Sequence, residues 1–321
     1  MIVGQGRAIE QFTSAWSSGR LHHGWLLAGP RGVGKASFAR MAATRLLAEA
    51  AGPEIDQPGL ETPSDHPIAR LLAAGSHPDF RWLERLERPT GGLARNISVD
   101  QIRSLGDLLG VTPSMSPWRA IVIDAVDDLE ASAANALLKM LEEPPAKTVF
   151  FLVSHVPGRL LPTIRSRCRR LDFHRLGDDV MTSLLSQSLP NENAASVQSL
   201  VGFANGSIGR AIDIATLDLA PLEQEALAIL RQGDPDNGRR SKLASALGPK
   251  GAADRYAAFL ELLPGLIAKE ALGLEGDARG RALAVYAQAR EMAVVAPRLS
   301  LDPAATIFQL GGALASVALK A

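Results

Sequence analysis

Short apolar runs alternate with helical patterns over the first half of the chain. The apolar runs predict buried strands over residues 24–28, 79–83, 120–124, 148–153 and 170–173. Apolar positions at helical spacing predict helices over residues 5–19, 36–48, 98–110 and 132–143. Strands that are apolar on both faces and alternate with helices are typical of a parallel sheet covered on both sides.

The pattern changes after about residue 173, where strand signals end and helical patterns rich in Ala and Leu take over. Candidate helices lie near residues 221–232, 252–272, 278–296 and 303–319. We therefore expect three domains, which are an α/β domain over residues 1–173, a small helical domain over 174–219 and an all-α domain over 220–321. Residues 51–75, rich in Pro, Gly and acidic side chains, predict an irregular insertion, and residues 232–238 predict a loop.

The charge and cysteine content exclude several kinds of site. The chain has 321 residues, with 34 Lys and Arg against 34 Asp and Glu, so net charge gives no support to nucleic-acid binding. The single cysteine, Cys168, excludes an internal disulfide and a cysteine-based zinc site. No stretch has the ~18–20 apolar residues of a membrane span, and the first residues lack the apolar core of a signal peptide. We expect a cytoplasmic protein with no metal and no membrane partner.

A glycine-rich loop follows the first predicted strand and precedes the next predicted helix. Its residues are Gly29, Pro30, Arg31, Gly32, Val33, Gly34 and Lys35, which match the pattern GxxxxGK. The glycines of such a loop allow backbone N–H groups to cradle phosphate oxygens, and the lysine reaches the outer phosphates. The order of strand, loop and helix therefore predicts a P-loop nucleotide-binding domain.

The residue after this loop lacks the oxygen that such sites use to bind magnesium. The position after Lys35 holds Ala36 instead of a Ser or Thr, whose hydroxyl is a magnesium ligand. Ser37 is one residue further on, and one residue turns the side chain by about 100° around the helix. We expect ATP binding that is weak or absent.

The second nucleotide strand also lacks part of its chemistry. Asp124 ends this strand, where it would hold magnesium through water, but Ala125 follows instead of the Glu that acts as general base. Asp127 and Asp128 lie too far along the chain to replace that base at the strand end. Since general base catalysis contributes ~10²–10⁴ in rate, we expect no independent hydrolysis.

Four arginines lie close together within residues 165–170. One interpretation is a basic patch for nucleic acid, and another is an ordinary solvated loop. A third is an arginine finger, a guanidinium presented to the γ-phosphate of a neighbouring subunit, which can contribute ~10³–10⁵ in turnover.

Two sequence motifs give the chain a family resemblance. Residues 132–145 are SAANALLKMLEEPP and residues 166–168 are SRC. Together they resemble the bacterial clamp-loader subunits of the AAA+ ATPases, over residues 1 to about 217. The resemblance implies an α/β P-loop domain of AAA+ or RecA-like type, then a helical lid domain and a C-terminal collar domain. Because Ala36 and Ala125 depart from the hydrolysing gamma/tau pattern, the chain is most similar to delta-prime subunits of DNA polymerase III.

The resemblance also implies roles for single residues. Arg167 would be the arginine finger, acting in trans on an adjacent gamma/tau subunit. Ser154 stands where the family places a polar sensor at a strand end. The usual sensor-2 arginine would stand at Gly209, one position before Arg210, so Arg210 is a doubtful nucleotide contact. Many relatives carry a four-cysteine zinc module after the P-loop helix, and we expect no zinc here.

The partners implied by the resemblance are gamma/tau and delta subunits of the holoenzyme, with the sliding clamp and primed DNA reached through the complex. Lys139 resembles positions that face the DNA backbone, although an exposed helix lysine explains it equally well. Two other functions stay open, namely an active AAA+ ATPase of gamma/tau type and a DNA-binding module that uses the arginines of residues 165–170. Nucleotide turnover by the purified chain would identify the first, and a steep salt dependence of DNA binding the second.

Overall fold

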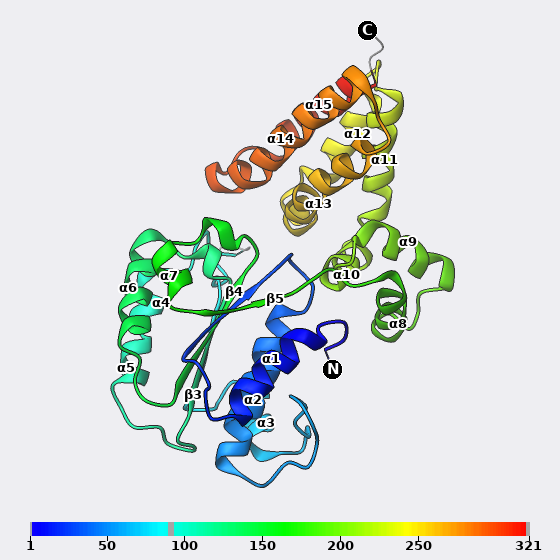
Figure 1. Cartoon of the computed structure of the whole chain (residues 1–321). Coiled ribbons are helices and arrows are strands. Elements are labelled where there is room, and N and C mark those ends of the chain that lie inside the picture. The colour runs from blue at the N-terminus through cyan, green and yellow to red at the C-terminus, as the bar shows by residue number, and fades with distance from the viewer. Residues whose placement is uncertain (1, 89–92, 319–321) are drawn as a thin grey trace. The chain divides into compact units, whose positions relative to one another are not determined.

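The Cα positions divide the chain into two units. A computed structural model describes residues 2–88 and 93–318 (Figure 1). The first unit comprises Met1–Ser188 with Asn205–Gly209, and the second comprises Leu189–Ala204 with Arg210–Ala321. The division into three domains at residues 173 and 219 stays a prediction.

The first unit is built on a five-stranded sheet in which every pairing is parallel. Its strands are β1 (Gly24–Ala28), β2 (Phe80–Leu83), β3 (Arg119–Asp124), β4 (Thr148–Ser154) and β5 (Arg169–Asp172). They lie side by side in the order β2-β3-β4-β1-β5. The predicted parallel α/β fold is confirmed, and each observed strand begins and ends within one residue of its predicted range.

Helices cover both faces of this sheet (Figure 1). The helices of the first unit are α1 (Gly6–Ser17), α2 (Lys35–Ala51), α3 (Pro67–Ala73), α4 (Val99–Arg103), α5 (Leu105–Leu109), α6 (Ala131–Glu142), α7 (Pro162–Ser166) and α8 (Asp178–Ser188). Alternate residues of the central strands face opposite sides, as the two-residue period of a strand requires. Val122 and Phe151 pack with α1, α2 and α3, whereas Ile121 and Phe150 pack with α4, α5, α6 and α7.

Two predictions for the first unit need correction. The helix predicted over 98–110 is interrupted at Ser104, whose hydroxyl donates to the carbonyl of Gln101 at 2.8 Å and competes with the helical pattern. The insertion predicted as irregular contains α3, whose N-cap is His66. The rest of that insertion is organised by Arg45 of α2, which is 5% exposed. Its guanidinium donates to the carbonyls of Ile55, Gln57 and Glu61.

All the described secondary structure of the second unit is helical, as predicted. Its helices are α9 (Ala194–Ala204), α10 (Ile208–Thr216), α11 (Ala220–Gln232), α12 (Gly238–Leu247), α13 (Ala253–Ala271), α14 (Gly276–Leu299) and α15 (Pro303–Val317), and α10 begins within the first unit. Three single turns complete the described helical elements, η1 (Val126–Asp128) and η2 (Pro157–Arg159) in the first unit and η3 (Lys250–Ala252) in the second. Within residues 2–88 and 93–318, no helix has the length and apolar character needed to cross a membrane.

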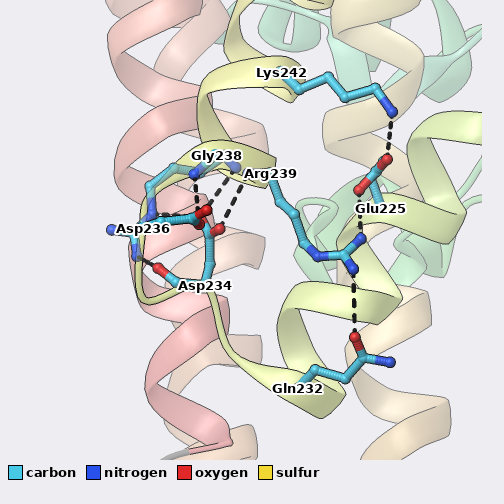
Figure 2. Close-up of polar contacts among 8 residues, drawn as sticks. Glu225, Gln232, Asp234, Asp236, Gly238, Arg239 and Lys242 are labelled. Carbon is cyan, nitrogen blue, oxygen red and sulfur yellow. Dashed lines mark hydrogen bonds and ion pairs between the residues drawn. The ribbon is translucent and has the colours of Figure 1, made fainter.

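The loop between α11 and α12 is fixed by charge pairs, which Figure 2 shows. The carboxylate of Asp234 accepts the backbone N–H groups of Arg239 and Arg240 at 3.0 and 3.1 Å, and so caps α12. Glu225 of α11 pairs with Arg239 at 2.9 Å and with Lys242 (Figure 2). The predicted loop at 232–238 is confirmed, while α12 was not predicted because its polar sequence GRRSKLASAL has little apolar periodicity.

Candidate functional site

The glycine-rich loop joins β1 to α2 at the carboxyl end of the sheet, where ligands of parallel α/β folds bind. Gly32 and Gly34 have φ of 74° and 100°, in the left-handed region that favours glycine. A Cβ at Gly29 would lie 2.2 Å from the carbonyl oxygen of Phe173, so this position has no room for a side chain. The loop therefore takes the shape that the GxxxxGK pattern predicts.

The loop presents donors that suit phosphate oxygens. In the described part of the chain, the backbone N–H groups of Gly32, Val33, Gly34 and Lys35 have no protein acceptor. They gather at the N-terminus of α2, whose dipole also favours an anion. Lys35 is 2% exposed, and its ammonium folds across the loop, donating to the carbonyls of Gly29 (2.7 Å) and Pro30.

Burial lowers the pKa of Lys35 to about 8, and the nearby charges of Asp124 and Asp127 act in the opposite direction. A phosphate group close to this ammonium would stabilise its charged form further. The residues present therefore fit the phosphates of a nucleotide such as ATP.

The same residues do not fit a magnesium site that supports hydrolysis. Ala36 offers no oxygen, and Ser37 is exposed. Asp124 ends β3 half-buried, and its pKa is raised by burial and by Glu84, while Lys35 and Arg31 lower it. Ala125, where a general base would stand, is 4% exposed and carries no titratable group. Across residues 2–88 and 93–318, no cluster of three or more His, Cys, Asp or Glu is placed to hold a metal.

The polar sensor position is already engaged by an aspartate that sequence analysis left out of the site. Ser154, at the end of β4, donates its hydroxyl to Asp127 at 2.8 Å. The same carboxylate accepts the backbone N–H groups of His155 and Val156 at 2.5 and 3.4 Å. Because the one hydroxyl proton of Ser154 is used by Asp127, Ser154 has none to donate to a phosphate. The single turn η1 brings Asp127 to β4, a long-range contact that its distance from Asp124 in sequence did not suggest.

His155 is a second residue that the sequence did not indicate. Burial, together with the charges of Lys35, Arg31 and Arg85, lowers its pKa to about 3. Its Nδ1 is buried, and none of the described residues hydrogen-bonds to it. The imidazole is therefore neutral and lies in a cationic neighbourhood beside the phosphate loop.

Residues 207–209, at the start of α10, contact the loop. The Ser207 hydroxyl donates to the carbonyl of Arg31 at 2.9 Å, and the Gly209 N–H donates to the carbonyl of Gly32 at 3.0 Å. A Cβ at Gly209 would lie 2.9 Å from the Cα of Gly32, so the backbones touch at this point. Arg210 instead belongs to the second unit, where its Nη2 donates to the carbonyl of Leu262 of α13 at 3.2 Å.

Arg167 lies at the C-terminal end of α7, on the surface of the first unit. Its Nη1 donates to the carbonyl of Thr163 at 3.0 Å, and its Nη2 lies 2.7 Å from Oε1 of Glu142, the last residue of α6. The following Cys168 is packed inward against Gly24, where a Cβ would lie 3.1 Å from both Cys168 Sγ and the Arg167 carbonyl oxygen. Burial raises the pKa of the Cys168 thiol to about 12, so it is a packing residue.

The neighbouring arginines have separate contacts. Arg170 pairs with Asp172 at 2.6 Å, and the Arg169 guanidinium lies 5.5 Å from the ring centre of Trp25. Arg165 is exposed on α7. Since acidic partners neutralise two of the four arginines, the group lacks the continuous positive surface of a phosphate-backbone site. Lys139 is exposed on α6, which agrees with both of its interpretations.

Comparisons with known proteins place these features in one family. Residues 4–177 match the family model described as "DNA polymerase III, delta subunit". The chain is 36% identical to DNA polymerase III subunit delta-prime of Pseudomonas aeruginosa over 190 residues, which are 58% of this chain and 53% of that protein. It is 29% identical to subunit tau of Bacillus subtilis over 272 residues, 82% of this chain and 45% of that protein. The matches thus span about half the length of these relatives.

Among solved structures, a DNA polymerase III gamma subunit-related protein of Thermotoga maritima shares the fold with a TM-score of 0.50 and 16% identity. The match covers 96% of this chain and 100% of that protein chain.

Proposed function

Since the chain belongs to the DNA polymerase III delta-subunit family, as a clamp-loader subunit of the delta-prime type, we propose that it supplies Arg167 in trans to an ATP site on an adjacent subunit. The observation that carries this proposal is the placement of Arg167, whose side chain is 34% exposed and whose guanidinium is held on the surface of the first unit. A guanidinium has five N–H donors, and two contacts leave further donors for a phosphate of a neighbouring molecule.

The chain's own nucleotide site contributes binding at most. Ala36 and Ala125 remove the magnesium ligand and the general base, and Ser154 is committed to Asp127. Gly29, Pro30, Arg31, Gly32, Val33, Gly34 and Lys35 would surround the phosphates if ATP binds. The role of this loop is then structural, because it links β1, α2 and residues 207–209 at the start of α10.

The proposed setting is a cytoplasmic clamp loader that also contains gamma/tau and delta subunits. Residues 1–173 would form the AAA+ domain, residues 174–219 the lid and residues 220–321 the collar that joins the partners. ATP bound by the adjacent gamma/tau subunit would meet Arg167, so that hydrolysis depends on assembly. The complex would load the sliding clamp on primed DNA as part of the DNA polymerase III holoenzyme.

The alternative is an active ATPase of gamma/tau type. The observation that favours this alternative is that the phosphate loop keeps both its backbone N–H donors and Lys35. Two absences argue against it, because Ala36 offers no magnesium ligand and Ala125 no general base. General base catalysis alone contributes ~10²–10⁴ in rate.

The test is Arg167→Ala in a complex reconstituted with gamma/tau and delta subunits. Removing an arginine finger costs on the order of 10³-fold at the site it serves, so DNA-stimulated ATP turnover at that site should be lost. Arg165→Ala, which changes an exposed arginine two residues earlier on α7, is the matched control and should leave turnover unchanged. Full turnover in Arg167→Ala would refute the proposed role.

A further inference from the structure

The pair formed by Arg167 and Glu142 connects two elements that end side by side. Glu142 is the last residue of α6, and Arg167 directly follows α7. Leu141 precedes Glu142, and the carbonyl of Ile164 accepts the backbone N–H of Arg167 at 3.2 Å. The side chains of Leu141 and Ile164 are buried in the same apolar core. The positions of both charged residues are therefore set by packed helices, while their side chains extend to the surface.

The two contacts of Arg167 fix its guanidinium in a defined place. Thr163 holds Nη1 through a backbone carbonyl at 3.0 Å, and Glu142 holds Nη2 through a carboxylate at 2.7 Å. A carbonyl of α7 alone would leave the planar group free to turn about that bond. The second acceptor, from a different helix, removes this freedom.

Stability does not account for the Glu142 contact. The two side chains are 34% and 47% exposed, and ion pairs at this exposure add little to folding. Holding a long side chain in one rotamer does matter for a residue that must meet a reacting group, because small displacements of such groups slow catalysis strongly.

We propose that Glu142 is a positioning residue that holds Arg167 in the orientation needed to reach the phosphates of a neighbouring subunit's ATP. This inference rests on the proposed function. Glu142 touches neither ATP nor the reacting atoms, and it acts through the guanidinium that it orients. The Glu142 carboxylate stays paired with Arg167 during ATP hydrolysis and transfers no proton.

The experiment uses the full chain in the complex reconstituted with gamma/tau and delta subunits. Glu142→Gln keeps the size of the side chain and removes its charge, and Glu143→Gln makes the same change at the next residue, which is also exposed. Glu142→Gln should lower kcat for ATP on the order of tenfold with KM unchanged, below the ~10²-fold that a displacement of about 1 Å can cost. Glu143→Gln should behave as the unchanged chain, and Glu142→Asp should recover part of the loss.

A double variant separates positioning from a general structural effect. If Glu142 acts through Arg167, Glu142→Gln should cause no further loss in a chain that already carries Arg167→Ala. Unchanged kcat in Glu142→Gln, or an equal loss with and without Arg167, would overturn the inference while the role of Arg167 stands. An Arg167→Ala complex with full turnover would instead refute the proposed function itself.

Discussion

The hydroxyl of Ser154 donates to the carboxylate of Asp127 at 2.8 Å, which joins the end of β4 to the turn that follows β3. Asp127 also accepts two backbone N–H groups from the residues after Ser154. The interaction adds a side-chain contact between β4 and the turn after β3, its neighbour in the sheet. It also engages the one hydroxyl proton of Ser154, whose role as a nucleotide sensor stays a prediction.

Removing this carboxylate should weaken the first unit. Asp127→Ala leaves three donors without their acceptor, and we expect a loss of about 2 kcal/mol in the free energy of unfolding, as for hydrogen bonds to a charged group. All four tryptophans, Trp16, Trp25, Trp82 and Trp118, belong to the first unit, so urea unfolding followed by tryptophan fluorescence measures this unit alone.

Asp128→Ala is the matched control for this change. Asp128 pairs with Arg85 at 3.2 Å with 35% of its side chain exposed, and such pairs contribute up to about 1 kcal/mol. An equal decrease in the free energy of unfolding in the two variants would show that the contact between Asp127 and Ser154 stabilises the unit no more than an exposed ion pair does.

Arg45 should control the order of the segment between α2 and α3. Its guanidinium donates to three backbone carbonyls from a position that is 5% exposed. Arg45→Ala should increase amide hydrogen exchange and protease cleavage over residues 53–62, because the carbonyls lose their donors. Arg45→Lys should restore little, since one ammonium cannot reproduce the planar fork.

The sheet should survive the loss of Arg45, so tryptophan fluorescence should stay close to that of the unchanged chain. Arg70→Ala, at an exposed arginine of α3, is the control and should leave exchange in this segment unchanged. Unaltered exchange in Arg45→Ala would show that the segment is held by its apolar contacts instead.

Glu223 should make the stability of the second unit depend on pH. It is 0% exposed in α11, and neither of its carboxylate oxygens has a hydrogen-bond partner among the described residues. Burial raises its pKa from 4.5 to about 7, against the opposing charges of Arg210 and Lys269. A raised carboxyl pKa means that the folded state prefers the proton, so this residue's contribution to stability falls as pH rises from 4.5 to about 7.

Glu223→Gln removes this dependence. The variant should be more stable than the unchanged chain by up to about 3 kcal/mol at pH 8, since each pKa unit is worth about 1.4 kcal/mol, and nearly equal to it at pH 4.5. Calorimetric unfolding at both values measures the difference. A gain of the same size at both pH values would contradict the assignment to Glu223 ionisation.

The sequence predicts the sheet well because its strands are continuous apolar runs bounded by polar residues. Residues 148–153 and 24–28, for example, are apolar at nearly every position and too short for a helix, so they predict strands. Helix α6 ends just before Pro144 and Pro145, which lack the backbone N–H donors that a helix needs. Helix α12 was missed because its helical form depends on the cap by Asp234 and on packing against α15. Such tertiary contacts produce no periodic pattern of apolar residues in the sequence.

Only the local part of the candidate site could be predicted from the sequence. The phosphate loop and Asp124 follow local rules of spacing, so their places could be predicted from the sequence. Asp127 contacts Ser154, which lies 27 residues further along the chain, and Gly209 contacts Gly32 of the phosphate loop across 177 residues. Local patterns do not encode such contacts. The pairing of Arg167 with Glu142 is likewise set by how α6 and α7 pack.

The most direct test of the account is ATP turnover by the full chain alone and after addition of a gamma/tau subunit, with magnesium present. The account predicts no turnover by the chain alone, and turnover in the mixture that falls when this chain carries Arg167→Ala. Magnesium-dependent turnover by the chain alone, lost in Lys35→Met, would contradict it and place the hydrolysis at the chain's own loop.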